Sequence, residues 1–162
     1  MPRPFASSTL PLATASSLLL ALATSACGLQ AESPASGNAP SGRHDDPALV
    51  WGPCPEFLPE GCAIAVLQGD PTEPNADIFF KVPGGSDVAA HWHTSAERMV
   101  LVSGRLTVDY AGQPSLTLTP GSYAYGPARA VHSARCAAGA DCVLFIAFEG
   151  PVDAIAGTPE AQ

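Results

Sequence analysis

Three histidines and one glutamate stand at spacings that suit a metal site. His91 and His93 are separated by one residue, Glu97 follows four residues later, and His132 lies further along the chain. Because alternate side chains of a strand share a face, His91 and His93 would project together. A tight turn at residues 94–96 would return the chain antiparallel and set Glu97 opposite this pair. Imidazoles and a carboxylate that converge from one side leave other coordination positions of a metal open.

The residues that frame these ligands make the pattern specific. A lone His-x-His pair is a weak signal, but the same pair with Glu97 and His132 at fixed distances from glycines and a proline is not. We therefore expect one divalent metal bound by His91, His93, Glu97 and His132, the last supplied by a second hairpin. A barrel that keeps its fold without the metal is the competing interpretation. The framing residues are Gly85, Gly104, Gly121 and Pro127.

The elements that must position the ligands are short strands. Gly and Pro supply 15 and 17 of the 162 residues, which favours many turns and excludes a helical bundle. Short apolar or alternating runs between turn signals predict an antiparallel sandwich or barrel. The nine candidate strands cover 63–68, 78–82, 88–93, 98–103, 105–110, 115–119, 122–125, 130–134 and 143–148.

The two framed segments resemble the motifs of the cupin superfamily, Gly-x5-His-x-His-x3,4-Glu-x6-Gly and Gly-x5-Pro-x-Gly-x2-His-x3-Asn. Eight of the ten motif positions match, with Arg129 in place of Gly and Cys136 in place of Asn. The resemblance implies an all-β jelly-roll barrel of two antiparallel sheets that binds one divalent metal, which would be Fe, Mn, Ni or Zn. Residues 65–71 are further similar to small bacterial cupins related to the cupin part of zinc-binding anti-sigma factors.

The cupin resemblance also implies a function. It points to a metal-dependent enzyme with dioxygenase, oxalate-degrading (decarboxylase) or isomerase chemistry on a small organic molecule. Glu97 would then bind the metal and could detach to act as a catalytic base. The alternative is a non-catalytic module that senses or binds a metal or small ligand at the cell envelope, as the anti-sigma similarity suggests.

The strand alternation predicts an apolar interior. Met99 and Leu101 share the inward face with Glu97, so few polar groups would orient a ligand. Arg129, close to His132 at the expected barrel mouth, is the candidate contact for an anionic substrate, with an exposed solubilising side chain as the alternative.

The outward face of the strand expected at 98–103 must also be covered from solvent. Val100 and Val102 point outward and are equally apolar. Either a homodimer packs sheet against sheet, or the N-terminal segment around Trp51 and Phe57 folds over this face.

The N-terminal residues predict an export signal. Arg3 is the first charge of residues 1–26, an apolar run covers 18–23, and small residues lead into Cys27. The residues around Cys27 are similar to a bacterial lipoprotein box, in which Cys27 takes lipid, although Thr24 stands where that box usually has Leu. We expect a lipid-anchored protein of the bacterial cell envelope, on the periplasmic or outer-membrane face.

An ordinary cleavage after Ala23 is the alternative and would release a secreted protein. After the signal at 1–26 we expect a flexible tether at 27–47, the cupin domain at 48–155 and a disordered tail at 156–162. The tether contains almost no large apolar residue, so it could not bury enough surface to fold.

Five cysteines are an odd number for an exported protein, and lipidation of Cys27 would leave four. We expect Cys54 to pair with Cys62 and Cys136 with Cys142, because each pair brackets a short turn-rich segment. The second bridge would brace the hairpin that enters the last strand. The other two pairings and a zinc site made of these four cysteines are the alternatives.

The net charge limits the kinds of molecule that the protein could bind. Seven Lys and Arg against 15 Asp and Glu give −8 at pH 7. This charge disfavours nucleic acid, and it would be repelled by anionic lipid, so any membrane attachment would come from the N-terminal lipid alone.

Overall fold

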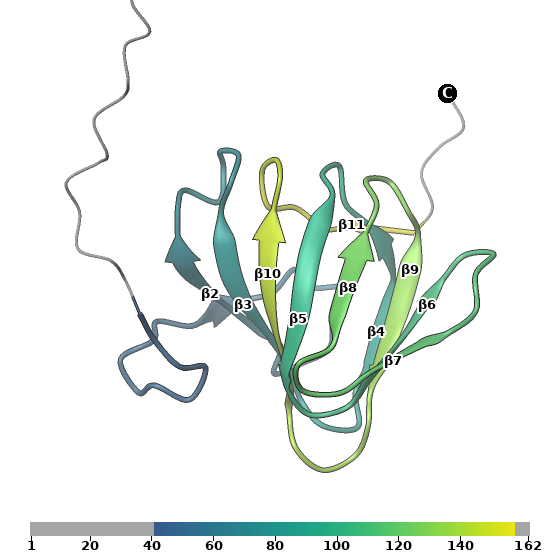
Figure 1. The fold of residues 1–162 in the computed structure, drawn as a ribbon, viewed down its shortest axis with the longest axis horizontal. Coiled ribbons are helices and arrows are strands. Elements are labelled where there is room, and N and C mark those ends of the chain that lie inside the picture. Colours follow the sequence, from purple (N-terminus) through teal and green to yellow (C-terminus); the bar gives the residue numbers. More distant parts are fainter. Residues whose placement is uncertain (1–40, 158–162) are drawn as a thin grey trace, which may run out of the picture. The chain divides into compact units, whose positions relative to one another are not determined.

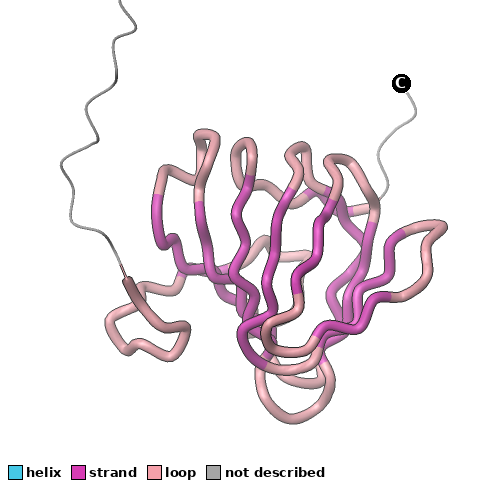
Figure 2. The backbone as a smooth tube through the Cα atoms, viewed as in Figure 1, coloured by secondary structure: helices cyan, strands magenta, loops and turns pink. Residues whose placement is uncertain are grey.

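The computed structural model describes residues 41–157, which fold into two antiparallel β-sheets with strands and loops but no helix in this range (Figure 2). The first sheet, sheet A, has the strand order β1-β2-β3-β10-β5-β8, and the second, sheet B, has the order β11-β4-β9-β6-β7. Strands β2, β3, β10, β5 and β8 of sheet A lie side by side in Figure 1. The strands are β1 (Gly52–Pro53), β2 (Ala63–Gln68), β3 (Asp77–Val82), β4 (Asp87–Trp92), β5 (Glu97–Ser103), β6 (Leu106–Tyr110), β7 (Leu116–Leu118), β8 (Tyr123–Gly126), β9 (His132–Cys136), β10 (Cys142–Phe148) and β11 (Ile155–Ala156).

This architecture confirms the all-β jelly-roll prediction. The nine expected strands correspond to β2–β10 and differ from them by no more than two residues at either end. The two-residue strands β1 and β11 were not expected, because two residues are too few to show an alternating pattern. Within the described range, no helix is long and apolar enough to cross a membrane. The expected signal at 1–26 and the expected lipidation site Cys27 lie outside the described residues.

The expected hairpin at residues 94–96 is wrong. β4 pairs with β9 and β11 in sheet B, whereas β5 pairs with β10 and β8 in sheet A. The turn therefore carries the chain from one sheet to the other, and Glu97 meets the histidines across the interior. A turn's length and residue types favour the nearest pairing, but in a jelly roll consecutive strands often belong to different sheets.

The main core fills the space between the sheets. Met99 and Leu101 are 3% and 0% exposed, so they face inward as their parity predicts. Other members of this core come from both sheets and include Val82, Leu106, Val108, Leu144 and Phe148.

A second cluster covers part of the outer face of sheet A. Trp51 and Leu49 pack there against Phe79 and Val143. The N-terminal segment thus covers this face through Trp51, whereas Phe57 packs against the inner core instead. The expected homodimer stays a prediction.

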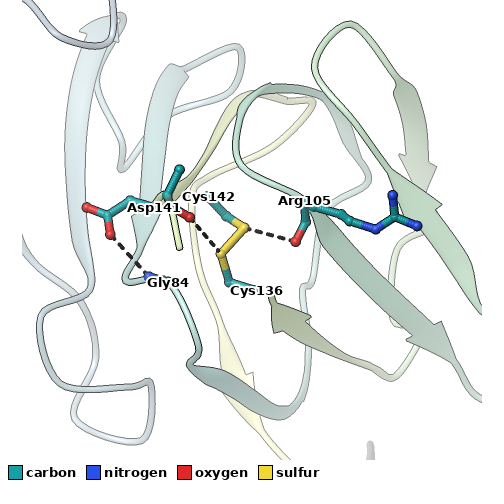
Figure 3. Close-up of a disulfide and its surroundings, with 6 residues drawn as sticks. Gly84, Arg105, Cys136, Asp141 and Cys142 are labelled. Carbon is teal, nitrogen blue, oxygen red and sulfur yellow. Dashed lines mark hydrogen bonds between the residues drawn. A yellow bond between two sulfur atoms is a disulfide. The ribbon is translucent and has the colours of Figure 1, made fainter. Parts of the chain in front are cut away.

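Both disulfides have the expected local pairing, Cys54 with Cys62 and Cys136 with Cys142. The second bridge does not brace a hairpin, because it joins the end of β9 in sheet B to the start of β10 in sheet A. Figure 3 shows this bridge beside the Arg105 carbonyl group, and the Asp141 carboxylate accepts a hydrogen bond from the Gly84 backbone N–H at 3.1 Å.

Candidate metal centre

The three histidines come together from two neighbouring strands of sheet B, β4 and β9, and from the residue just after β4. His91 in β4 is the cross-strand partner of His132, the first residue of β9, and their ring centroids lie 4.2 Å apart. His93 lies just beyond the end of β4, with its ring centroid 5.0 Å from that of His91. One ring nitrogen from each histidine lies within 4.8 Å of those of the other two. All three side chains are buried, so the group is shielded from bulk water.

Each of these imidazoles is oriented by a backbone carbonyl. The Nδ1–H of His91 donates to the Ala89 carbonyl oxygen at 2.8 Å, and that of His132 donates to the Ala130 carbonyl oxygen at 3.0 Å. The Nδ1–H of His93 donates to the carbonyl oxygen of Asp153. Because a neutral imidazole has one donor and one acceptor, these bonds leave the lone pair on Nε2 of all three rings. Each of the three rings thus offers Nε2 as the atom that can bind a metal.

Glu97 completes the set from sheet A. It begins β5, is 3% exposed, and its Oε1 lies 3.7 Å from Nε2 of both His93 and His132. These gaps are too long for hydrogen bonds. They are close to the separation of about 3.4 Å between two ligand atoms bound about 2.1 Å from a tetrahedral centre. The three histidines therefore fit one divalent metal ion, and Glu97 lies beside two of them, although it is not part of the group whose atoms all lie within 4.8 Å of one another. The predicted role of Glu97 as the fourth ligand stays a prediction.

The electrostatics of the site also fit a cation. Burial lowers the pKa of His91 to about 4, with a further contribution from neighbouring His132, and burial lowers the pKa of His132 to about 4. Both imidazoles are therefore neutral near pH 7, the form that binds metal. Burial raises the pKa of Glu97, and the nearby His93 acts in the opposite direction. A bound cation would favour the ionised carboxylate.

Tyr110 is a site residue that the sequence analysis did not identify. It pairs with His132 across β6 and β9, is 4% exposed, and its hydroxyl group has no hydrogen-bond partner within the described part of the chain. Burial and the nearby Glu97 raise the pKa of its phenol. A Cβ on Gly126 would stand 2.6 Å from Glu97 Oε1 and 2.9 Å from Tyr110 Oη, so any larger residue here would displace these side chains. Leu106, Val108 and Tyr110 alternate along one strand, so all three side chains point inward. This alternation was the sequence pattern that could have identified Tyr110.

The C-terminal segment was also missed. Besides the carbonyl that orients His93, the Asp153 carboxylate accepts hydrogen bonds from Thr94 N at 3.0 Å and Thr94 Oγ1 at 2.6 Å. β11 then pairs with β4 beside His91. No local motif connects residues about sixty positions apart, so spacing alone could not predict this support.

Arg129 does not occupy the expected position at the cavity. Its backbone has φ of 63°, the left-handed region in which the cupin motif has Gly. Its guanidinium lies 4.8 Å from the Trp92 ring centroid, and Arg129 is not among the residues that line the cavity beside the histidines. Arg129 is therefore an exposed side chain that does not line this cavity, and its contact with an anionic substrate stays a prediction.

The fold and the three-histidine site define a metal-binding cupin. The chain belongs to the family of the ChrR Cupin-like domain, whose profile matches residues 44–153. A search of the curated proteins found no match.

Solved structures show the same fold. The chain is similar to the DMSP lyase DddQ from Ruegeria pomeroyi DSS-3, with 18% identity, a TM-score of 0.58, and coverage of 70% of this chain and 64% of that one. It is also similar to a cupin-2 domain protein from Rhodospirillum rubrum, with 16% identity, a TM-score of 0.58, and coverage of 72% and 80%. A third similar structure is an oxalate decarboxylase, with 17% identity, a TM-score of 0.53, and coverage of 62% and 29%. The chain thus spans less than two thirds of the length of that lyase.

Proposed function

We propose that this protein is an exported, metal-dependent enzyme that acts on a small organic molecule. The preferred reaction is dioxygenase-like, and decarboxylation and isomerisation are the alternatives. One observation carries the proposal. The four ligand side chains stand at the edge of a cavity inside the barrel, so a bound metal would have coordination positions open to a second molecule. The enzymatic roles of the similar lyase and decarboxylase support a search for turnover.

The residues of this chain have distinct roles in the proposal. A bound metal would supply Lewis acidity or a site where substrate and dioxygen meet. His91, His93 and His132 bind it as neutral ligands. Glu97 supplies negative charge and, because burial raises its pKa, is suited to accept a proton from substrate. The apolar walls exclude water from the reacting groups.

The experiment is a comparison of two histidine variants. Wild-type protein purified from its own compartment is analysed for bound metals and then tested for oxygen consumption and product formation on small organic acids. We expect His93→Ala to lose metal and turnover together. His44→Ala is the matched control, because His44 lies outside the ligand set, and it should keep both. Turnover in metal-free His93→Ala would contradict the proposal.

A non-catalytic metal-binding or sensing module is the second candidate. The observation that favours it is the number of ligands, since three histidines and one carboxylate can fill a tetrahedral zinc site with no open position. One equivalent of zinc without exchangeable water would support this candidate. A redox-active metal with exchangeable water would support the enzyme.

We further propose that the chain is anchored in the bacterial cell envelope through lipid on Cys27. The two disulfides support the oxidising compartment that this location implies. Membrane fractionation of the Cys27→Ala variant tests the anchor, because loss of the lipid should move the protein to the soluble fraction.

A further inference from the structure

The cavity beside the ligands has a strongly uneven chemistry. Its volume is about 150 Å³, and it lies between the sheets. Its polar lining groups in the described part of the chain are the four metal ligands and Asp153. The remaining walls are carbon, contributed by side chains such as Ile64, Phe80, Val88, Leu106, Leu144 and Ile146.

Two segments outside the sheets limit the size of what can enter. Pro55 and Leu58, from the loop closed by the Cys54–Cys62 bridge, line the cavity on one side. Val152, next to Asp153 in the C-terminal segment, also lines it. A dry cavity of this volume in an engineered protein accommodates benzene, so the expected guest has a hydrocarbon body of about six carbon atoms.

The charges of the lining residues limit the guest further. No Lys or Arg side chain of residues 41–157 lines the cavity. The Asp153 carboxylate already accepts two hydrogen bonds from Thr94. A second anionic group at the far end of a guest would therefore be buried against carbon without a counter-charge, which is costly.

The metal end favours one negative charge. Three neutral imidazoles and the Glu97 carboxylate around a divalent cation leave a net charge of +1 on the metal and its ligands, and one carboxylate from a guest neutralises it. The Asp153 carboxylate, which lines the same cavity, adds negative charge and further disfavours a second acid group. A dianion at this place would instead leave an excess negative charge in a low-dielectric interior.

We infer that this cavity takes a compact monocarboxylate, with its carboxylate at the metal centre and an uncharged hydrocarbon body of about six carbons or fewer in the apolar space. This inference rests on the proposed function, because it assigns the substrate class to the same metal site. It also separates this cavity from sites that take small dicarboxylates, since the described lining offers no cation for a second acid group.

The experiment uses protein loaded with Co²⁺, whose visible spectrum reports ligands that reach the metal. Hexanoate and adipate are titrated in parallel, because they have the same number of carbons and differ by one terminal carboxylate. We expect hexanoate to change the spectrum and to bind at least about tenfold more tightly than adipate, which must bury a second charge. Equal or tighter binding of adipate, or failure of both acids to bind, would overturn the inference while leaving the metal site intact.

A cavity-filling variant adds a second measurement. Ala134 lines the cavity, so Ala134→Leu should weaken hexanoate binding by at least about fivefold. Its effect on acetate, which occupies only the metal end, should be small. Ala111→Leu, at an exposed turn, is the matched control and should change neither affinity. Unchanged hexanoate binding in cobalt-loaded Ala134→Leu would contradict the assigned cavity. Failure of the wild-type protein to bind cobalt would instead overturn the proposed function itself.

Discussion

The two ends of the barrel are held together in different ways. β9 runs from His132 at the metal centre to Cys136, and β10 runs from Cys142 to Phe148, whose ring lies 5.4 Å from that of His93. One end of these strands therefore contains the ligands, and the other contains the disulfide.

The disulfide end is closed by covalent and close backbone contacts. Gly104 has φ of 82°, and a Cβ there would stand 2.8 Å from Cys142 Sγ. The metal end is different, because the Tyr110 hydroxyl and Trp92 Nε1 are buried there without a hydrogen-bond partner among residues 41–157. Such groups cost stability unless a ligand satisfies them. The comparison shows that a covalent bridge closes one end, whereas the other end holds the ligand side chains and buried polar atoms without protein partners.

The largest expected effect is a loss of unfolding free energy at low pH in the metal-free protein, and it comes from the histidines of the metal end. His91 and His132 have pKa values lowered to about 4 in the folded state against 6.5. Their contribution is fully present above pH 6.5 and is lost as the pH falls toward 4, by up to about 3 kcal/mol for each. Glu97 acts in the opposite sense, because its pKa is raised and its contribution is lost as the pH rises.

Chemical denaturation of chelator-treated protein at pH 7, 5.5 and 4 measures this effect. His44→Ala should show the same pH dependence as the wild type. Because Glu97 opposes the change, the measurement is repeated on Glu97→Gln, and an unfolding free energy of this variant that stays constant from pH 7 to 4 would contradict the burial of neutral imidazoles.

The next effect concerns the disulfide end. Replacing both Cys136 and Cys142 by Ser should lower the free energy of unfolding by about 2–3 kcal/mol, because the unfolded chain gains conformational freedom. Metal affinity should change by less than about twofold, because His132 is positioned at the far end of β9 by its bond to Ala130. Calorimetry for unfolding and a competition titration for metal check the two parts. A large loss of metal affinity would show that the ends are coupled.

The smallest expected effects come from the same substitution, glycine to alanine, made once at each end of the barrel. Gly104→Ala should destabilise the fold by about 2 kcal/mol, because φ is positive and the new methyl group meets backbone. Gly126→Ala should instead displace the Glu97 carboxylate and lower metal affinity by about tenfold or more. Denaturation curves and metal titrations on both variants separate these results. A loss of metal affinity in Gly104→Ala together with a loss of stability alone in Gly126→Ala would contradict the division between the two ends.

Much of the fold and the ligand set could be predicted, because both depend on local patterns. Alternation identified β2–β10, and the framed motifs identified the three histidines that the structure brings together, with Glu97 beside two of them. Spacing could not show that residues 94–96 cross between sheets, since periodicity fixes the face of a strand and not its partner. The support from Asp153 and the Tyr110 hydroxyl depends on tertiary contacts, and the stacking of Arg129 on Trp92 depends on where a left-handed turn directs its side chain.

The most direct test is a crystal structure of the cobalt-loaded protein with anomalous diffraction at the cobalt edge. We predict a single strong peak about 2.0–2.2 Å from Nε2 of His91, His93 and His132 and from a carboxylate oxygen of Glu97. A protein that binds no cobalt in the barrel, or a peak from which His132 or Glu97 points away into water, would contradict the metal centre described here.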